Sequence, residues 1–180
     1  AGIQAIRDRK THYVPSLGLM ELRAAVVEEI KNTRGYAPDI DQVVITPGLK
    51  PGIFFSMLAL VDPGDEVIFP EPGYPAYGSA AAMIGADPVP VPLLEENSFR
   101  MNPDDVLQRV TGKTKAVIIN SPQNPTGSVM TEDELREIHD IAREHDFFVI
   151  SDEVYSKMTY DGTPAPSITT EDQARERPNR

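Results

Sequence analysis

Apolar residues along the chain alternate between a helical and an extended spacing. Spacings of three and four residues predict amphipathic helices, which cover residues 19–33, 50–61 and 76–84. Short runs rich in β-branched residues predict strands, which cover residues 42–46, 66–69, 115–120 and 147–151. A weaker run over residues 89–93 contains two prolines, which places it at a sheet edge or outside the sheet.

Two further helices are predicted from their starting residues. Asn102 followed by Pro103 and two acidic residues is typical of a capped helix start, and Thr131 with Glu134 fits a capping box. The buried stripe of this last helix is predicted to be Leu135, Ile138, Ala142 and His145. Strands that alternate with helices predict an α/β fold, in three layers, with a mostly parallel sheet covered by helices on both faces.

Charge and cysteine content narrow the classes of function. The 180 residues include 28 acidic and 17 basic side chains, for a formal charge of −11, which argues against a nucleic-acid surface. The chain has no cysteine, so disulfides and thiolate metal sites are excluded. His139 and His145 lack partners at ligand spacing, so we predict no metal site. No apolar run is long enough to span a membrane, and we expect a cytoplasmic protein.

The loops that follow the strands carry the candidate chemistry, because ligands of open parallel sheets bind at the carboxyl ends of the strands. Each loop also has a plain structural explanation: a Gly-Pro turn, a packing tyrosine, an Asx-turn or a helix N-cap. Together they offer a phosphate-binding turn, an aromatic face, an amide and a carboxylate, in the segments 47–52, 71–77, 121–127 and 151–155. This set suits a planar, phosphorylated, heteroaromatic cation.

The same segments resemble a known family. Asn124-Pro125-Thr126-Gly127, with Asp152-Glu153-Val154-Tyr155 after an apolar strand, is similar to the class I/II pyridoxal-phosphate aminotransferases of fold type I. Four other segments resemble family segments in the same order: Tyr13–Arg23, Thr46–Gly52, Asp62–Val67 and Pro72–Tyr77. The resemblance therefore covers nearly the whole chain.

The resemblance implies roles for the residues around the cofactor ring. Asp152 would bind the pyridine nitrogen of pyridoxal 5'-phosphate and keep it protonated. Asn124 and Tyr155 would hydrogen-bond the phenolic oxygen of the ring, and Tyr74 would stack on its face. Asp152, Tyr155 and Asn124 are thus the expected catalytic residues.

The resemblance also implies a phosphate site and a subunit arrangement. Gly48, Leu49 and Lys50 would hold the phosphate, mainly through backbone N–H groups at a helix N-terminus. Tyr13 resembles the tyrosine that reaches the phosphate of a neighbouring subunit, so a homodimer is expected.

The expected covalent anchor of the cofactor is missing from these residues. The family forms a Schiff base through a lysine in a Ser-Lys pair on a later strand, and none of the six lysines has that context. Lys157 is expected to be a solvated residue of a short helix that begins near Asp152. We therefore expect residues 1–168 to be an incomplete cofactor-binding large domain and residues 169–180 a polar, disordered end or linker, without the small C-terminal domain.

The resemblance implies transfer of an amino group from an amino acid to a 2-oxo acid by a ping-pong reaction. The chain alone is expected to be inactive. Two alternatives stay open at this point: a C–S lyase or synthase of the same fold, and the aminotransferase-like sensor domain of a transcription regulator.

Overall fold

A computed structural model of the protein describes residues 1–170, and the chain divides into two compact units after Pro47. The first unit contains two helices and a short 3-10 helix: α1 (Gly2–Arg7), α2 (Met20–Arg34) and η1 (Ile40–Gln42). Helix α2 ends at Gly35, whose left-handed φ of 76° is costly for residues with a Cβ. The predicted helix over residues 19–33 is confirmed to within one residue at each end.

The strand predicted over residues 42–46 is wrong. Val43 ends η1, and residues 43–46 are extended without belonging to a sheet. The backbone groups of this segment bond elsewhere: Nε of the buried Arg23 donates to the Val43 carbonyl at 2.9 Å, and the Ile45 N–H donates to the Leu17 carbonyl at 3.0 Å. This β-branched run therefore forms no strand, and the side chain of a buried arginine, rather than a neighbouring strand, donates a hydrogen bond to its Val43 carbonyl.

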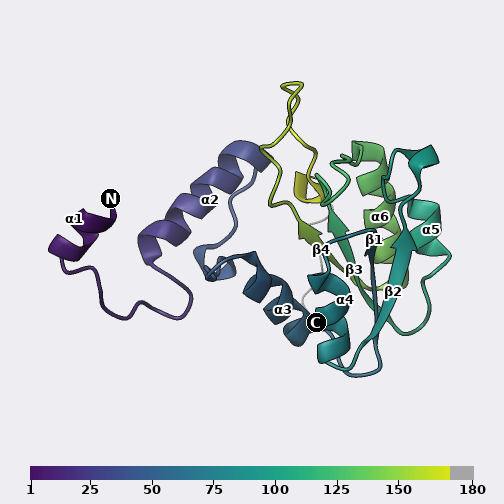
Figure 1. The fold of residues 1–180 in the computed structure, drawn as a ribbon, viewed down its shortest axis with the longest axis horizontal. Helices are drawn as coiled ribbons and strands as arrows, with labels where there is room; N and C mark the ends of the chain where they lie inside the picture. The colour runs from purple at the N-terminus through teal and green to yellow at the C-terminus, as the bar shows by residue number, and fades with distance from the viewer. Residues whose placement is uncertain (171–180) are drawn as a thin grey trace. The chain divides into compact units, whose positions relative to one another are not determined.

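The second unit, from Gly48 onward, is built on a four-stranded parallel sheet in the order β2-β1-β3-β4 (Figure 1). Its strands are β1 (Glu66–Glu71), β2 (Asp87–Pro92), β3 (Thr114–Asn120) and β4 (Phe148–Asp152). Its helices are α3 (Leu49–Leu60), α4 (Ala76–Met83), η2 (Glu95–Asn97), α5 (Pro103–Leu107), α6 (Glu132–His145) and η3 (Ile168–Thr170). The predicted α/β fold with a parallel sheet is confirmed.

Strand β2 pairs only with β1 in the described sheet, so it lies at the edge, as its prolines predict. A proline has no N–H to donate to a neighbouring strand, and an edge position leaves one side without a ladder. The central strand β3 is buried at six of its seven residues, which explains its continuous apolar sequence.

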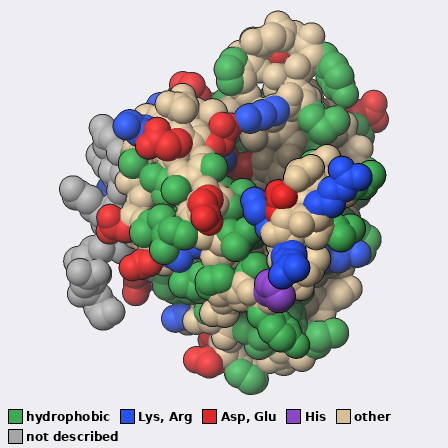
Figure 2. Space-filling model, turned by 90° about the vertical axis from the view of Figure 1, so that its left-hand side faces the viewer, with side chains coloured by type: hydrophobic (Ala, Val, Ile, Leu, Met, Phe, Trp, Pro, Cys, Tyr) green, Lys and Arg blue, Asp and Glu red, His purple; other side chains and the backbone are tan. Residues whose placement is uncertain are grey.

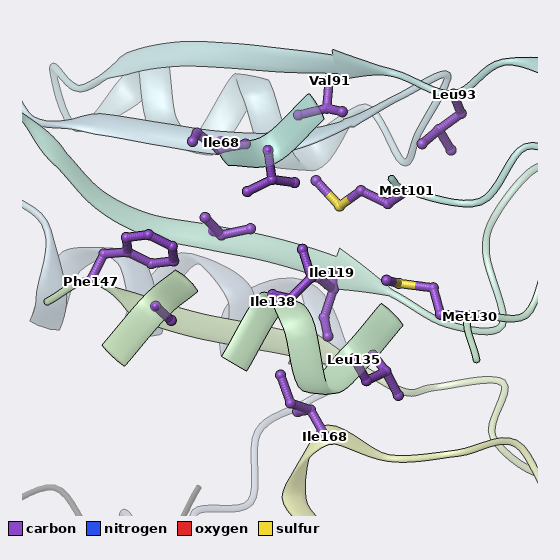
Figure 3. Close-up of a cluster of buried hydrophobic side chains, with 13 residues drawn as sticks. Ile68, Val91, Leu93, Met101, Ile119, Met130, Leu135, Ile138, Phe147 and Ile168 are labelled. Atoms are coloured by element: carbon purple, nitrogen blue, oxygen red, sulfur yellow. The ribbon is translucent and has the colours of Figure 1, made fainter. Parts of the chain in front are cut away.

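Two apolar cores cover the two faces of the sheet. One core packs Ile68, Val117 and Ile119 of the strands against Ile138 and other residues of α6 (Figure 3). The other packs Val67 and Ala116 against α3 and α4, where Met57, Tyr77 and Ala81 are fully buried. Helices on both faces hold the strand ends in fixed positions, which the pocket described below requires.

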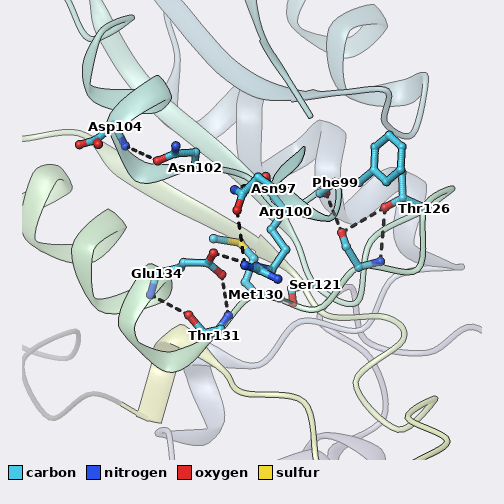
Figure 4. Close-up of polar contacts among 11 residues, drawn as sticks. Asn97, Phe99, Arg100, Asn102, Asp104, Ser121, Thr126, Met130, Thr131 and Glu134 are labelled. Carbon is cyan, nitrogen blue, oxygen red and sulfur yellow. Dashed lines mark hydrogen bonds and ion pairs between the residues drawn. The ribbon is translucent and has the colours of Figure 1, made fainter. Parts of the chain in front are cut away.

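Helix α6 begins at the predicted capping box. The Thr131 hydroxyl accepts from the Glu134 N–H at 3.2 Å, and the Glu134 carboxylate accepts from the Thr131 N–H at 2.8 Å (Figure 4). Arg100 adds an ion pair to Glu134 at 2.8 Å. The predicted buried stripe is wrong at one residue, because His139 is buried and His145, at the helix end, is exposed.

The sequence predictions about surface charge, membrane spans and the polar end can be compared with the described residues. On the face drawn in Figure 2, basic side chains are scattered among acidic and apolar ones rather than gathered in one patch. Within residues 1–170 there is no helix with the length and apolar content needed to cross a bilayer. The polar end predicted for residues 169–180 lies outside the described residues beyond Thr170, and residues 169–170 belong to η3.

Candidate functional site at the carboxyl edge of the sheet

A pocket of about 250 Å³ opens where β3 and β4 end and α3 begins. We call it the carboxyl-edge pocket, and its lining residues are Leu49, Lys50, Tyr74, Tyr77, Asn120, Asn124, Asp152, Val154 and Tyr155. The β-strands are parallel, so loops far apart in sequence meet at this edge.

Asp152 is the last residue of β4 and the only acidic residue among those that line the pocket. Its side chain is 5% exposed, and two donors hold it: the Tyr77 hydroxyl at 2.7 Å from Oδ2 and the Val154 N–H at 3.2 Å from Oδ1. The short helix expected after Asp152 is wrong, because residues 154–157 form a turn, which begins at the residue whose N–H donates to Asp152 Oδ1. Lys157 is exposed in that turn.

Tyr77 is a pocket residue for which the sequence predicted no individual role, although it lies in the predicted aromatic segment 71–77. It lies in α4, is fully buried, and packs edge-to-face against Tyr74 with ring centroids 5.7 Å apart. Burial raises the pKa of Tyr77 far above its usual value, and the hydrogen bond to Asp152 and its negative charge raise the pKa further. The hydroxyl therefore keeps its proton and donates to Asp152 throughout the physiological pH range.

Asn120, at the end of β3, joins the two strand ends that carry the polar groups. Its Nδ2 donates to the Asp152 carbonyl at 2.9 Å, and its Oδ1 accepts from the Asn124 N–H at 2.8 Å. Asn124 then places its own Nδ2 3.4 Å from the Tyr155 hydroxyl. An amide and a phenol thus lie side by side at the pocket wall, as a ligand oxygen would require.

The first turn of α3 also lines the pocket. Gly48 precedes the helix with a φ of 93°, and a Cβ built there would meet no other atom, so its glycine serves the backbone conformation rather than space. Leu49 and Lys50 follow, with N–H groups in the turn where a helix has no acceptors of its own. The Lys50 ammonium lies 5.9 Å from the centroid of the Tyr74 ring.

The structure brings most of the predicted site residues to this one pocket. Six line it, namely Leu49, Lys50, Tyr74, Asn124, Asp152 and Tyr155, and Gly48 lies next to it in sequence. Tyr13 belongs to the first unit, where its side chain is fully exposed, and its role towards a neighbouring subunit stays a prediction. Tyr77 and Val154 lie in segments that the sequence singled out, although no role was predicted for either residue, and Asn120 was not predicted as a site residue.

A larger hollow of about 510 Å³ adjoins the carboxyl-edge pocket and shares Asn124 and Tyr155 with it. We place the site in the smaller pocket because it combines a buried carboxylate, aromatic rings and a helix N-terminus. No group of three or more acidic or histidine side chains suited to a metal ion occurs within the described part of the chain.

Fold and pocket together define a class of protein: an α/β domain that binds a flat, anionic ligand where parallel strands end. Residues 2–179 match the family model of the class I and II aminotransferases. The chain belongs to that family. Its members depend on pyridoxal phosphate, so the predicted cofactor is confirmed.

Curated relatives and solved structures agree with the family. The chain is 42% identical over 175 residues to aromatic-amino-acid aminotransferase 2 of Thermococcus litoralis. The matched segment covers 97% of this chain and 45% of the relative. It is 44% identical over 168 residues to an aspartate aminotransferase of Pyrococcus abyssi. That match covers 93% of this chain and 43% of the relative. The chain therefore spans less than half the length of these relatives.

Among solved structures, the aromatic aminotransferase of Pyrococcus horikoshii superimposes with a TM-score of 0.92 at 40% identity, over 97% of this chain and 47% of that one. The N-succinyldiaminopimelate aminotransferase of Mycobacterium tuberculosis superimposes with a TM-score of 0.92 at 36% identity. This superposition covers 97% of this chain and 46% of that one. The fold type I likeness expected from the sequence is confirmed.

Proposed function

We propose that the whole protein containing these residues is an aminotransferase that moves an amino group from an amino acid to a 2-oxo acid. The observation that carries the proposal is the buried carboxylate of Asp152, which faces a pocket with an aromatic ring and a helix N-terminus. The names of the relatives favour amino transfer over the lyase and the sensor alternatives.

The residues of the carboxyl-edge pocket fit pyridoxal phosphate by their chemistry. A buried carboxylate needs a cationic partner to offset its desolvation, and a protonated pyridine nitrogen is such a partner for Asp152. A phosphate needs N–H donors and positive potential, which the first turn of α3 and Lys50 offer. Tyr74 supplies a flat aromatic face, and Asn124 and Tyr155 line the same pocket.

The role of each residue follows from these positions. When bound, the cofactor withdraws electrons from the Cα of the amino acid, which is the chemistry that amino transfer requires. Asp152 would hold the proton on the ring nitrogen, and the Tyr77 hydroxyl would fix the carboxylate that does so. Asn124 and Tyr155 would donate hydrogen bonds to the phenolic oxygen, and Gly48, Leu49 and Lys50 would hold the phosphate.

Three finer parts of the proposal concern the whole protein. We propose that residues 1–168 form an incomplete large domain and that the lysine that attaches the cofactor is none of the six in this chain, since Lys157 does not line the pocket and Lys50 is assigned to the phosphate. We propose a homodimer in which Tyr13 of one protomer reaches the phosphate site of its partner. A cytoplasmic location is proposed on the composition of the chain.

The test uses the full-length protein and the variant Asp152→Asn, which removes the charge and keeps the size of the side chain. We expect the wild type to bind pyridoxal phosphate and transfer amino groups, and the variant to lose about 10²- to 10³-fold in turnover. Asp104→Asn, an exposed change on α5, is the matched control. A wild type that binds no pyridoxal phosphate, or an Asp152→Asn variant with full turnover, would contradict the proposal.

Borohydride reduction of the loaded protein, followed by peptide mass mapping, tests the attachment site separately. We expect the label on a lysine other than the six in this chain. A label on Lys50 or Lys157 would contradict the assignment.

A further inference from the structure

Gln123 is a buried glutamine that joins two loops of the carboxyl-edge pocket. These are the Asn124 loop, residues 121–128, and the Tyr74 loop, residues 72–75. The side chain is 6% exposed. Its Oε1 accepts from the N–H of Thr126 at 2.8 Å and from the Thr126 hydroxyl at 2.6 Å, and its Nε2 donates to the Pro72 carbonyl at 2.8 Å.

The Asn124 loop holds the Oε1 end of this side chain firmly. The Gln123 N–H donates to the Ser128 carbonyl at 2.9 Å, and the Gly127 N–H donates to the Gln123 carbonyl at 2.8 Å. The hydroxyls of Thr126 and Ser128 lie 3.0 Å apart, and Ser128 donates to the Phe99 carbonyl at 2.8 Å (Figure 4). Because the loop is cross-linked in this way, Nε2 is a donor at a fixed position.

Three contacts hold the Tyr74 loop in place near Tyr74. At its start, Gly73 packs so closely on the Pro70 carbonyl that a Cβ would overlap it. At its end, the Tyr77 N–H donates to the Tyr74 carbonyl at 3.1 Å. The third tie is Nε2 of Gln123 on Pro72, two residues before Tyr74, and it comes from the loop that carries Asn124.

We propose that Gln123 is a positioning residue that sets the spacing between the Tyr74 ring and the Asn124 amide, and through it the affinity for pyridoxal phosphate. The inference rests on the proposed function of the pocket. Pro72 is an exposed residue and its bond to Gln123 is only partly buried, so we expect water to reach this carbonyl once the Gln123 donor is gone. Loss of the donor therefore releases the Tyr74 loop without leaving a buried carbonyl unpaired, and it affects binding more than stability.

The experiment titrates the full-length apoprotein with pyridoxal phosphate and compares the wild type with Gln123→Met. We expect the dissociation constant to rise by about tenfold or more, because this variant removes the bond to Pro72 together with the two bonds that Thr126 donates to Oε1. The same change is then made in a Tyr74→Ala background, where there is no ring to position. There we expect the effect of Gln123→Met to fall below about twofold, because coupled residues are not additive.

A second variant, Gln123→Glu, isolates the bond to Pro72. It keeps the side-chain volume and the oxygen that accepts from Thr126, and it replaces the Nε2 donor with an acceptor. We expect the dissociation constant to rise about tenfold, the scale of this one lost bond, and this variant decides the matter if Gln123→Met does not fold. Gln108→Met, an exposed change at the end of α5, is the matched control and should bind like the wild type.

The outcomes separate this inference from the proposed function. If the wild type and Gln108→Met bind pyridoxal phosphate and both Gln123 variants bind equally well, the positioning role is overturned and the proposed function stands. An effect of equal size in the Tyr74→Ala background, or two Gln123 variants that fail to fold, would also overturn it in favour of a structural role. A wild type that does not bind pyridoxal phosphate overturns both.

Discussion

Tyr77 carries the most specific prediction about the pocket. Tyr77→Phe removes one oxygen atom, which donates to Oδ2 of Asp152 at 2.7 Å. Tyr77 is fully buried and Asp152 is 5% exposed, so the donor is lost from a largely buried carboxylate. Hydrogen bonds to charged groups contribute roughly 1.5–3 kcal/mol, and we expect the free energy of unfolding to fall by about 2 kcal/mol.

The assay is urea unfolding of the full-length protein at neutral pH, followed by circular dichroism. Tyr160→Phe removes the same atom from a side chain that is 94% exposed, and it should stay within about 0.5 kcal/mol of the wild type. If Tyr77→Phe is as stable as Tyr160→Phe, the hydroxyl does not stabilise Asp152 and the reasoning fails.

The same residue gives a pH dependence whose sign is fixed. Burial and Asp152 raise the pKa of folded Tyr77 above the ordinary value of 10.0 that applies in the unfolded chain. Above pH 10 the unfolded state therefore loses a proton that the folded state keeps, and stability falls as pH rises, by about 1.4 kcal/mol per pH unit. Tyr77→Phe has no such proton, so its stability deficit relative to the wild type should shrink between pH 10 and pH 11. A constant deficit would refute the assignment.

Two smaller changes test the local architecture by the same unfolding assay. Gly73→Ala places a Cβ against the Pro70 carbonyl and should cost more than about 2 kcal/mol, whereas Gly112→Ala, where a Cβ meets no atom, should be neutral or slightly stabilising. Thr131→Ala removes the hydroxyl that caps α6 and should cost about 1 kcal/mol, and Thr131→Ser should restore most of it. If Gly73→Ala is as stable as Gly112→Ala, the close packing of Gly73 on Pro70 does not matter for stability. If Thr131→Ala is as stable as Thr131→Ser, the hydroxyl does not cap α6.

Sequence patterns predicted the inner strands well, because strands such as β3, which is buried at six of its seven residues, read as nearly continuous apolar runs. The residues after those runs had to meet at one edge, and Asn124 and Asp152 do so. Residues 42–46 have the same β-branched composition and form no strand, since their partners are Arg23 and Leu17 rather than a strand. A β-branched composition favours an extended backbone, but the segment becomes a strand only where a neighbouring strand accepts and donates its backbone hydrogen bonds.

The supporting residues of the pocket could not be predicted in the same way. Tyr77 lies in an alanine-rich helix and contacts a carboxylate 75 residues later, so only the folded chain connects them. Asn120 ends an apolar strand and bonds through both ends of its amide to β4 and to the Asn124 loop. Such residues bind other protein groups rather than the ligand, and no local spacing marks them.

The polar groups of the pocket impose one orientation on a ligand. Each oxygen of Asp152 accepts one described hydrogen bond, and a carboxylate oxygen has two acceptor positions, so an acceptor is available at this end. The first turn of α3 and Lys50 present donors and positive charge elsewhere in the pocket lining. A ligand with a protonated ring nitrogen and a phosphate can satisfy both groups of residues in one direction only. Because Tyr77 and Val154 already fix the carboxylate, that ligand loses little affinity to the ordering of this side chain.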